Sequence, residues 1–93
     1  MRNYDLVSVL ERRFTIQILL ALNEYGAMNI HTLNKMIGGN NKTILNRVNE
    51  MEDVGLVSTY RSLNYNQRIA TNTPYGAHII RSLTLAIKEG WNV

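Results

Sequence analysis

The sequence lacks cysteine, contains a single proline and is poor in aromatic residues, which make up 8% of its 93 residues. The absence of cysteine excludes a disulfide framework and a thiolate metal site. The longest aliphatic run extends from Ile18 to Leu22, far short of the roughly 20 residues that a membrane-spanning helix needs. Residues 1–13 lack the uninterrupted apolar core of a signal peptide. These absences predict a single cytoplasmic domain that does not enter a membrane.

Acidic residues are absent from two long stretches of the chain. The seven acids stand at positions 5, 11, 24, 50, 52, 53 and 89, whereas Lys and Arg number ten and the net charge is +3. Residues 25–49 contain no carboxylate but include Lys35, Lys42 and Arg47, and residues 54–88 contain only basic charges. This clustering indicates a polarised surface with a basic face, which favours an anionic partner.

The first segment of the chain is helical by its pattern. Within residues 3–24, Leu and Ile recur at three- and four-residue steps, and further apolar residues lie outside that stripe. A helix that is apolar nearly all round needs a second burying surface, and another subunit is the expected one. We expect a break near Arg12–Arg13 and an end at Gly26, a residue that can adopt positive φ.

A helix-turn-helix outline follows over about residues 29–54. Asn29 is the expected N-cap of a short helix over residues 30–37. Two glycines then form a turn, and Asn40 or Asn41 caps the next helix. Two short helices joined by a glycine turn are typical of this motif.

A β-hairpin and a last helix complete the chain. The expected strands are Leu56–Arg61 and Gln67–Thr71, joined by a five-residue loop. Thr73 is the expected N-cap of the last helix, and Pro74 takes its first position. The inward stripe of this helix is expected to comprise Ile79, Ile80, Leu83 and Ile87. The expected fold is therefore mostly α with a small β-hairpin, ordered helix, helix, helix, hairpin, helix around a three-helix core.

With these elements in this order, the chain resembles a winged helix-turn-helix domain from about Arg12 to Lys88, and residues 1–93 are expected to form one such domain. The phrase KTILNRVNEMEDVGLV resembles the recognition-helix signature of the HxlR and MarR types of winged-helix regulator, and RRFTIQILLAL resembles the first core helix of the HxlR group. QRIATNTPYG resembles the segment where a wing arginine leads into Leu-Thr-x-x-Gly, although Asn72 replaces the leucine. The residue usage is also similar to that of small regulators encoded by archaea or their viruses.

The resemblance implies a transcriptional regulator that binds double-stranded DNA as a homodimer. Its recognition helix, residues 41–54, would enter the major groove, and its wing, residues 56–72, would lie on the backbone or in the minor groove. The implied DNA contacts are Lys35, Asn40, Asn41, Lys42, Thr43, Asn46, Arg47, Arg61, Asn64, Tyr65 and Arg68. Arg and Asn side chains can read guanine and adenine edges bidentately. The implied dimer contacts, on the first and last helices, are Val7, Phe14, Ile18, Leu85 and Trp91.

Two other functions stay open: an architectural protein that coats DNA without sequence preference, and a winged-helix module that binds proteins. The amides of residues 41–54 argue against the first, because lysines alone would suffice for phosphates. The acid-free basic stretches argue against the second. His31 and His78 have no cysteine partners, and the acids at 50, 52 and 53 lack a fourth ligand. We therefore expect no enzyme, cofactor or metal site, and the sequence identifies no small-molecule effector.

Overall fold

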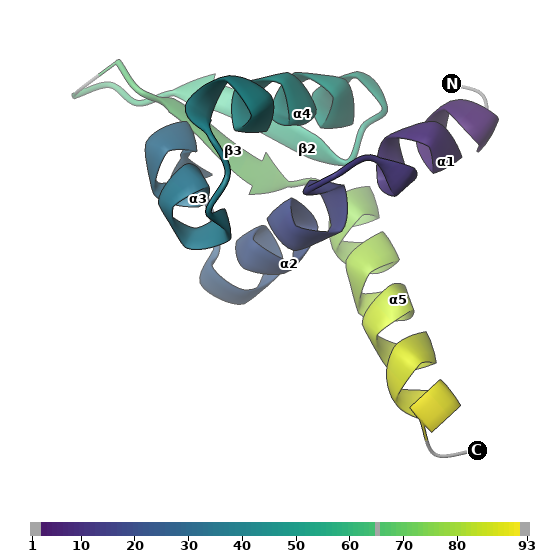
Figure 1. Cartoon of the computed structure of the whole chain (residues 1–93). Coiled ribbons are helices and arrows are strands. Elements are labelled where there is room, and N and C mark those ends of the chain that lie inside the picture. Colours follow the sequence, from purple (N-terminus) through teal and green to yellow (C-terminus); the bar gives the residue numbers. More distant parts are fainter. Residues whose placement is uncertain (1–2, 65, 92–93) are drawn as a thin grey trace.

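The computed structural model describes residues 3–64 and 66–91, and the side chains of residues 5–64 and 66–89 (Figure 1). Tyr65 and the side chain of Trp91, both expected to make contacts, lie outside these described parts. The elements in chain order are α1 (Asn3–Glu11), α2 (Thr15–Tyr25), β1 (Met28–Asn29), α3 (Ile30–Ile37), α4 (Asn41–Asp53), β2 (Val57–Arg61), β3 (Arg68–Asn72) and α5 (Pro74–Trp91).

A sharp turn divides the apolar N-terminal segment into two helices. Between α1 and α2, Phe14 has a φ of 75°, in the left-handed region that bulky side chains rarely adopt. The next residue, Thr15, is fully buried, and its hydroxyl donates a hydrogen bond of 2.7 Å to the carbonyl of Val9. This bond ties the start of α2 to α1, and the expected break near Arg12–Arg13 is confirmed.

Asparagine caps begin both helices of the helix-turn-helix. The Asn29 Oδ1 accepts a hydrogen bond of 2.7 Å from the backbone N–H of Thr32, and the Asn40 Oδ1 accepts one of 2.8 Å from that of Thr43. Each bond satisfies a backbone donor that has no partner within its helix. Asn29 is thus confirmed as the cap of α3, and of the two candidates for α4, Asn40 is the cap.

The hairpin belongs to a three-stranded antiparallel sheet with the order β1-β3-β2. The register pairs Thr59 of β2 and Met28 of β1 with the same residue of β3, the buried Ala70. The strand β1 was not expected from the sequence, because a two-residue strand contains no alternation from which it could be recognised. This strand attaches the start of α3 to the wing.

One core joins α2, α3 and α4 to the sheet and to the start of α5. Its most deeply buried residues include Ile18, Leu19, Leu33, Ile44, Val48, Met51, Leu56, Ala70 and Ile80. Burial along α5 ends near Ile80, since Leu83 and Ile87 are 37% and 60% exposed, and the inward stripe expected for this helix is wrong at both positions.

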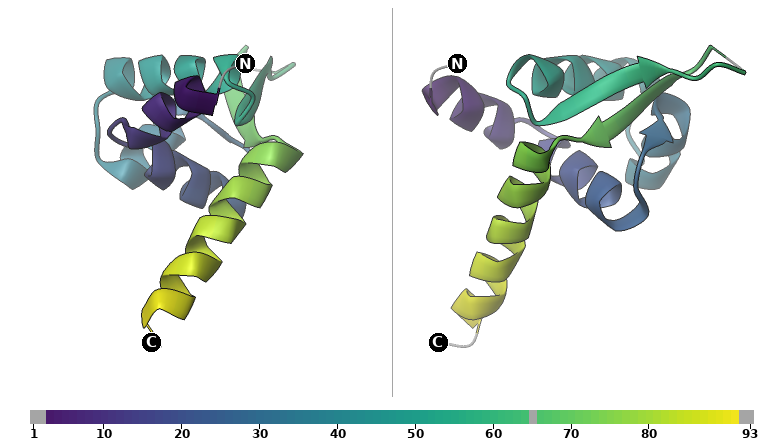
Figure 2. Two further views of the ribbon diagram at one scale, coloured as in Figure 1. Left: turned by 90° about the vertical axis from the view of Figure 1, so that its right-hand side faces the viewer. Right: turned by 180° about the vertical axis from the view of Figure 1, so that it is seen from behind.

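The second half of α5 projects away from the body of the molecule (Figure 2). The principal extents of the molecule, 48 × 27 × 24 Å, reflect this projection. Among the described residues, no helix is long and apolar enough to cross a membrane.

Candidate nucleic-acid interface

Helix α4 lies along one edge of the molecule, and the β2–β3 hairpin extends past the end at which α4 begins (Figure 1). The inner stripe of α4 is fully buried in the core and comprises Ile44, Val48 and Met51. The exposed residues on the opposite side define what we call the outward face of α4. They are Asn41, Lys42, Leu45, Asn46 and Asn49. Successive members of this set are separated by one or three residues, and Asn41 and Lys42 precede Leu45 and Asn46 by four, so the set shares one side of the helix.

Arg47 does not belong to the outward face. Its Nε donates to the carbonyl of Arg13 at 2.7 Å and its Nη1 donates to Glu50 Oε1 at 2.8 Å, which leaves the side chain 14% exposed. Because consecutive residues of a helix differ by about 100° in direction, Asn46 can point outward while Arg47 points toward the α1–α2 turn. In this structure Arg47 therefore fastens α4 to the N-terminal helices and does not lie on the face from which it was expected to read a base.

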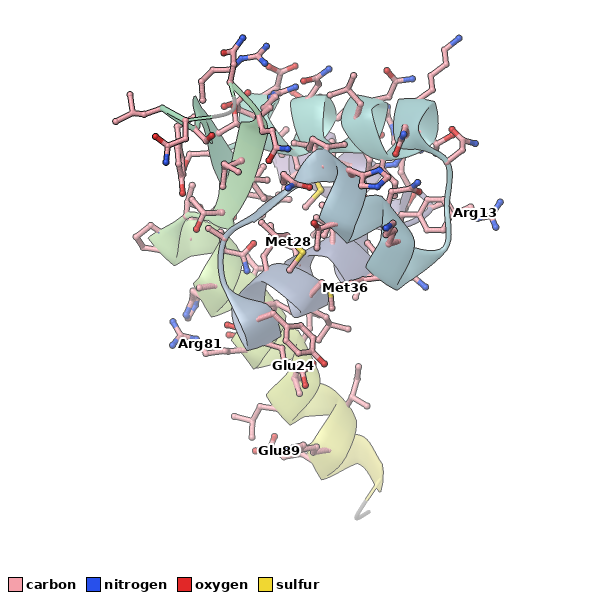
Figure 3. The ribbon with its side chains drawn as sticks, turned by 90° about the vertical axis from the view of Figure 1, so that its left-hand side faces the viewer. Arg13, Glu24, Met28, Met36, Arg81 and Glu89 are labelled. Carbon is pink, nitrogen blue, oxygen red and sulfur yellow. The ribbon has the colours of Figure 1, made fainter. Side chains whose placement is uncertain are left out.

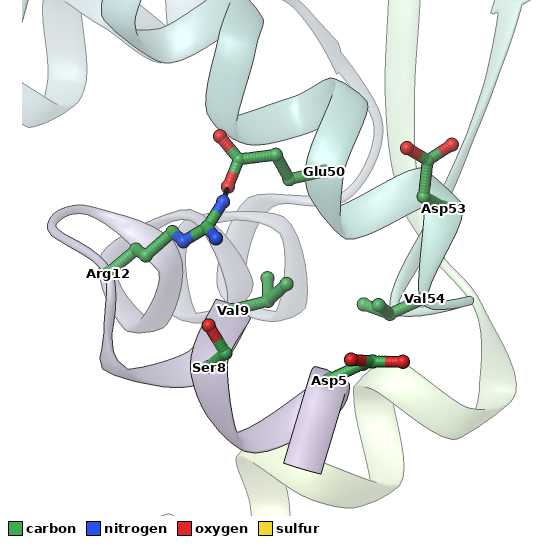
Figure 4. Close-up of a pocket in the computed structure, with 7 residues that line it drawn as sticks. All are labelled: Asp5, Ser8, Val9, Arg12, Glu50, Asp53 and Val54. Atoms are coloured by element: carbon green, nitrogen blue, oxygen red, sulfur yellow. Dashed lines mark hydrogen bonds and ion pairs between the residues drawn. The ribbon is translucent and has the colours of Figure 1, made fainter. Parts of the chain in front are cut away.

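Arginine and glutamate side chains hold α4 in place on the side of α1. Glu50 accepts hydrogen bonds from both Arg12 and Arg47. The Arg12–Glu50 pair crosses a pocket of about 430 Å³ between α1 and the end of α4, with Asp5 and Asp53 at its rim (Figure 4). Within the described ranges, no group of His, Asp and Glu residues is arranged to hold a metal ion.

A second arginine–glutamate pair holds α4 from the side of the wing. Arg68 of β3 donates through Nη2 to Glu52 Oε1 at 2.9 Å and through Nη1 to Asn49 Oδ1 at 2.5 Å. Glu52 Oε2 also accepts from the hydroxyl and backbone N–H of Thr59, at 2.8 and 3.1 Å. The hydrogen bond from the Thr59 hydroxyl, followed by the Thr59 N–H and the charge of Arg68, lowers the pKa of Glu52 despite its partial burial. Arg68, expected to contact DNA directly, is thus bound to Asn49 and Glu52 within the protein.

Most of the other expected DNA contacts are exposed. They are Lys35, Asn40, Asn41, Lys42, Asn46, Arg61 and Asn64, whereas Thr43 is half-buried. Arg61 of β2 donates to the carbonyl of Asn66 at 3.1 Å, which holds its guanidinium at the wing. The Asn29 Nδ2 donates to Gln67 Oε1 at 3.0 Å, so the wing is also linked to the start of α3.

Three residues of this region were not expected from the sequence. Leu45 and Asn49 complete the outward face, and their spacing from Lys42 and Asn46 was the available signal. Arg13 is exposed beside the turn that precedes α4 (Figure 3) and lines a polar pocket there with Asn40. Its chain position, far from the helix-turn-helix, gave no such signal. A positive charge beside a helix N-terminus adds to the attraction of that site for an anion.

The carboxylates that have no role in holding α4 include two at the opposite end of the molecule. Figure 3 shows Glu24 at the end of α2 and Glu89 on α5, both well away from α4. Glu50 and Glu52, which do lie on α4, are paired with arginines. The outward face of α4 itself contains no carboxylate.

The expected dimer contacts separate into exposed and buried residues. Val7 on α1 and Leu85 on α5 are 49% and 58% exposed. Ile18 is fully buried in the core, so the expectation that it reaches a second subunit is wrong. Phe14 packs against the core and lies beside Gly39, whose Cβ, if present, would approach the Phe14 ring to 3.2 Å. Phe14 therefore supports the α3–α4 turn.

Replacing Arg47 by alanine is expected to lower the free energy of unfolding by about 2 kcal/mol, because the change removes two hydrogen bonds of a mostly buried cation and leaves Glu50 with fewer partners. Urea denaturation of wild type and variant measures this loss. Base preference, determined by selection from random duplexes, is expected to stay the same. An Arg47→Ala variant that is as stable as the wild type but accepts a different base at one position would restore Arg47 as a base-reading residue.

Residues 5–67 match the model of a protein family described as the N-terminal domain of the methanogenesis regulatory protein FilR1. A comparison with curated proteins found no match. The matched range contains α2, α3, α4 and β2, and thus the helix-turn-helix and half of the wing.

Solved structures of transcriptional regulators share the fold. A MarR family regulator from Silicibacter pomeroyi has a TM-score of 0.77 and 20% identity over 94% of this chain and 59% of its own. A homodimeric winged helix-turn-helix domain from Mycobacterium bovis has a TM-score of 0.80 and 17% identity, over 92% of this chain and 78% of its own. MepR from Staphylococcus aureus, in its complex with DNA, has a TM-score of 0.81 and 14% identity, over 94% of this chain and 73% of its own.

The chain spans 56% to 65% of the length of several longer regulators that it matches. The structural similarity confirms the expected winged helix-turn-helix fold. The family match extends over more than half of the chain. This protein therefore belongs to the family of the N-terminal domain of the methanogenesis regulatory protein FilR1.

Proposed function

We propose that this protein is a transcription regulator that binds double-stranded DNA sequence-specifically as a homodimer, with α4 in the major groove. The observation that carries the proposal is the outward face of α4. Three asparagines, a lysine and a leucine are exposed there, and residues 41–49 contain no carboxylate. An α-helix fits the major groove of B-DNA, where each base pair presents a distinct pattern of donors and acceptors.

The side chains of the outward face suit the chemistry of base edges. Amides such as Asn46 can donate and accept at once, Lys42 can contact a phosphate or guanine, and Leu45 can contact the methyl group of thymine. The backbone N–H groups at the start of α4 and the nearby Arg13 favour a phosphate at that end of the helix. A face built from lysines alone would serve phosphates equally well, so this mixture favours sequence-specific binding.

The wing and α3 supply further contacts to the backbone. Arg61 on β2 and Lys35 on α3 are exposed, on elements that flank α4. Arginines on a wing are attracted to the negative potential of the minor groove. Such phosphate and minor-groove contacts fix the register of the protein on the duplex.

Self-association is supported by the apolar side chains that α1 and α5 leave exposed. Val7, Leu83, Leu85 and Ile87 are between 37% and 60% exposed, and α5 projects from the body of the molecule. The similar domain from Mycobacterium bovis is described as homodimeric. In a dimer with twofold symmetry, two copies of α4 would read half-sites about one helical turn of DNA apart.

Fluorescence anisotropy with labelled duplexes tests this function. The protein is expected to bind DNA from the region upstream of its own gene and to stay bound in excess random duplex, with two chains per duplex at the end point. The affinity is expected to fall as salt rises, because bound phosphates release counterions.

Two outcomes would contradict the proposal. Equal affinity for the upstream duplex, for random duplexes and for a duplex selected from a random library, at every salt concentration, would indicate an architectural protein that contacts phosphates alone. Absence of binding at low salt would indicate a winged-helix module that recognises a protein. A reference duplex selected from a random library serves as the positive control, since the upstream region need not contain the operator.

A further inference from the structure

We propose that Arg68 fixes the amide of Asn49 so that Asn49 presents its NH₂ group to the DNA and reads a keto base, guanine or thymine. The proposal rests on the function proposed above and names the chemistry that one position of the recognition helix selects. Asn49 is a specificity residue in this view, and Arg68 is the residue that orients it.

The position of Asn49 on α4 places it on the outward face. It follows Lys42, Leu45 and Asn46 by seven, four and three residues, the spacings at which side chains share one side of a helix. All four side chains are exposed. Asn49 therefore lies along the same line of approach to the major groove as the other members of the face.

The contact with Arg68 decides which atom of the amide points toward the wing. A guanidinium group carries only donors, so the atom that meets Arg68 Nη1 at 2.5 Å has to be the amide oxygen of Asn49. The NH₂ group then lies on the other branch of the amide, away from Arg68. Reversing the amide would place NH₂ against a cation and would lose a charge-assisted hydrogen bond.

Arg68 is itself held in place on its other side. Its Nη2 donates to Glu52 Oε1 at 2.9 Å, and the side chain is 21% exposed. Glu52 is in turn held by two hydrogen bonds from Thr59 on the neighbouring strand. A chain of contacts from β2 through Glu52 and Arg68 thus reaches the Asn49 amide and removes its freedom to rotate.

An amide fixed in this way distinguishes keto bases from amino bases. Bidentate reading of adenine requires the amide oxygen to accept from N6 while the NH₂ group donates to N7. In Asn49 the oxygen faces the wing, so only the NH₂ group is available to the groove. It can donate to O6 of guanine or to O4 of thymine. Adenine and cytosine present amino groups at the same place in the groove, and these are donors that would oppose it.

Selection of binding sites from a random duplex library tests the assignment. The wild type is expected to prefer guanine or thymine over adenine at one position of each half-site by roughly tenfold. The Asn49→Asp variant retains an acceptor for Arg68 but lacks the NH₂ group, so its preference there is expected to move to cytosine or adenine. The Arg68→Met variant releases the amide and is expected to accept adenine, in addition to guanine and thymine, at that same position.

Asn46→Ala is the matched control, because it removes an amide one turn away that Arg68 does not contact in any described interaction. It is expected to change the base preference at a different position of the site and to leave the preference at the position read by Asn49 as in the wild type. Circular dichroism melting of each variant identifies any loss of fold before selection. An adenine preference in the wild type, or Arg68→Met selecting the same bases as the wild type, would overturn the inference while leaving sequence-specific binding intact. A wild-type protein that enriches no sequence would overturn both the inference and the proposed function.

Discussion

Replacing Gly76 by alanine is expected to lower the free energy of unfolding by about 3 kcal/mol or more, although alanine is the better helix former. Gly76 lies in the first turn of α5, and a Cβ there would stand 2.0 Å from the carbonyl oxygen of Leu56. That oxygen cannot easily move, since it accepts from the N–H of Thr73 at 3.1 Å. The helix would have to separate from the start of β2. Urea denaturation of both proteins measures the loss.

Ser82→Ala is the matched control for this change. Ser82 is exposed on the same helix, so its substitution is expected to alter the free energy of unfolding by no more than about 0.5 kcal/mol. An equally stable Gly76→Ala variant would show that α5 can shift at little cost. The same contacts explain why Thr73 and Gly76 occur together. The hydroxyl of Thr73 accepts from the N–H of Gly76 at 3.0 Å and donates to the carbonyl of Gly55 at 2.6 Å.

Replacing Lys42 by glutamate is expected to weaken DNA binding by about ten- to a hundredfold at 0.1 M salt and to lower the salt dependence by at least one phosphate contact. Lys42 is exposed in the first turn of α4, on the outward face. A carboxylate there would remove an attractive contact and introduce repulsion at the point where the helix enters the groove. Anisotropy titrations over a salt series measure both effects.

Lys88→Glu is the control, because it changes the net charge equally but lies on the last turn of α5. It is expected to reduce affinity by less than about threefold, through the overall field of the protein alone. Equal losses for the two variants would mean that net charge governs binding and that the outward face of α4 has no local role.

The sequence indicated most of the local structure, because local structure depends on side chains close together in the chain. Asn29 and Asn40 carry their capping groups three residues before the N–H groups they bind. Gly26 and Gly38 adopt positive φ at the ends of their helices. The wing followed from two strand-like runs. The strand β1 was missed, because its pairing partner in β3 lies about forty residues away and local pattern does not report such a contact.

In the candidate site, too, the features set by local spacing were predicted and those set by long-range contacts were not. Lys42 and Asn46 were identified correctly as exposed members of one face, since i to i+4 spacing is a local property. Arg47 was assigned to DNA by its place on α4 and Arg68 by its place in the wing, but each also has a partner from a distant segment, Arg13 for the first and Asn49 for the second. Residue type alone does not reveal whether an arginine will find a carboxylate within its own chain.

By itself the sequence determined the order of the elements other than β1, the helix caps, the turn glycines and the stretches without acidic residues. Only the tertiary structure decided which charged side chains form ion pairs within the protein. Folding brings Arg12 to Glu50, which also pairs with Arg47 within α4, and brings Arg68 to Glu52, so that α4 is held from both sides and two of its three carboxylates are paired. The reason is physical: capping and periodicity are set within one or two turns of chain, whereas the partner of a long charged side chain is chosen by the packing of whole elements.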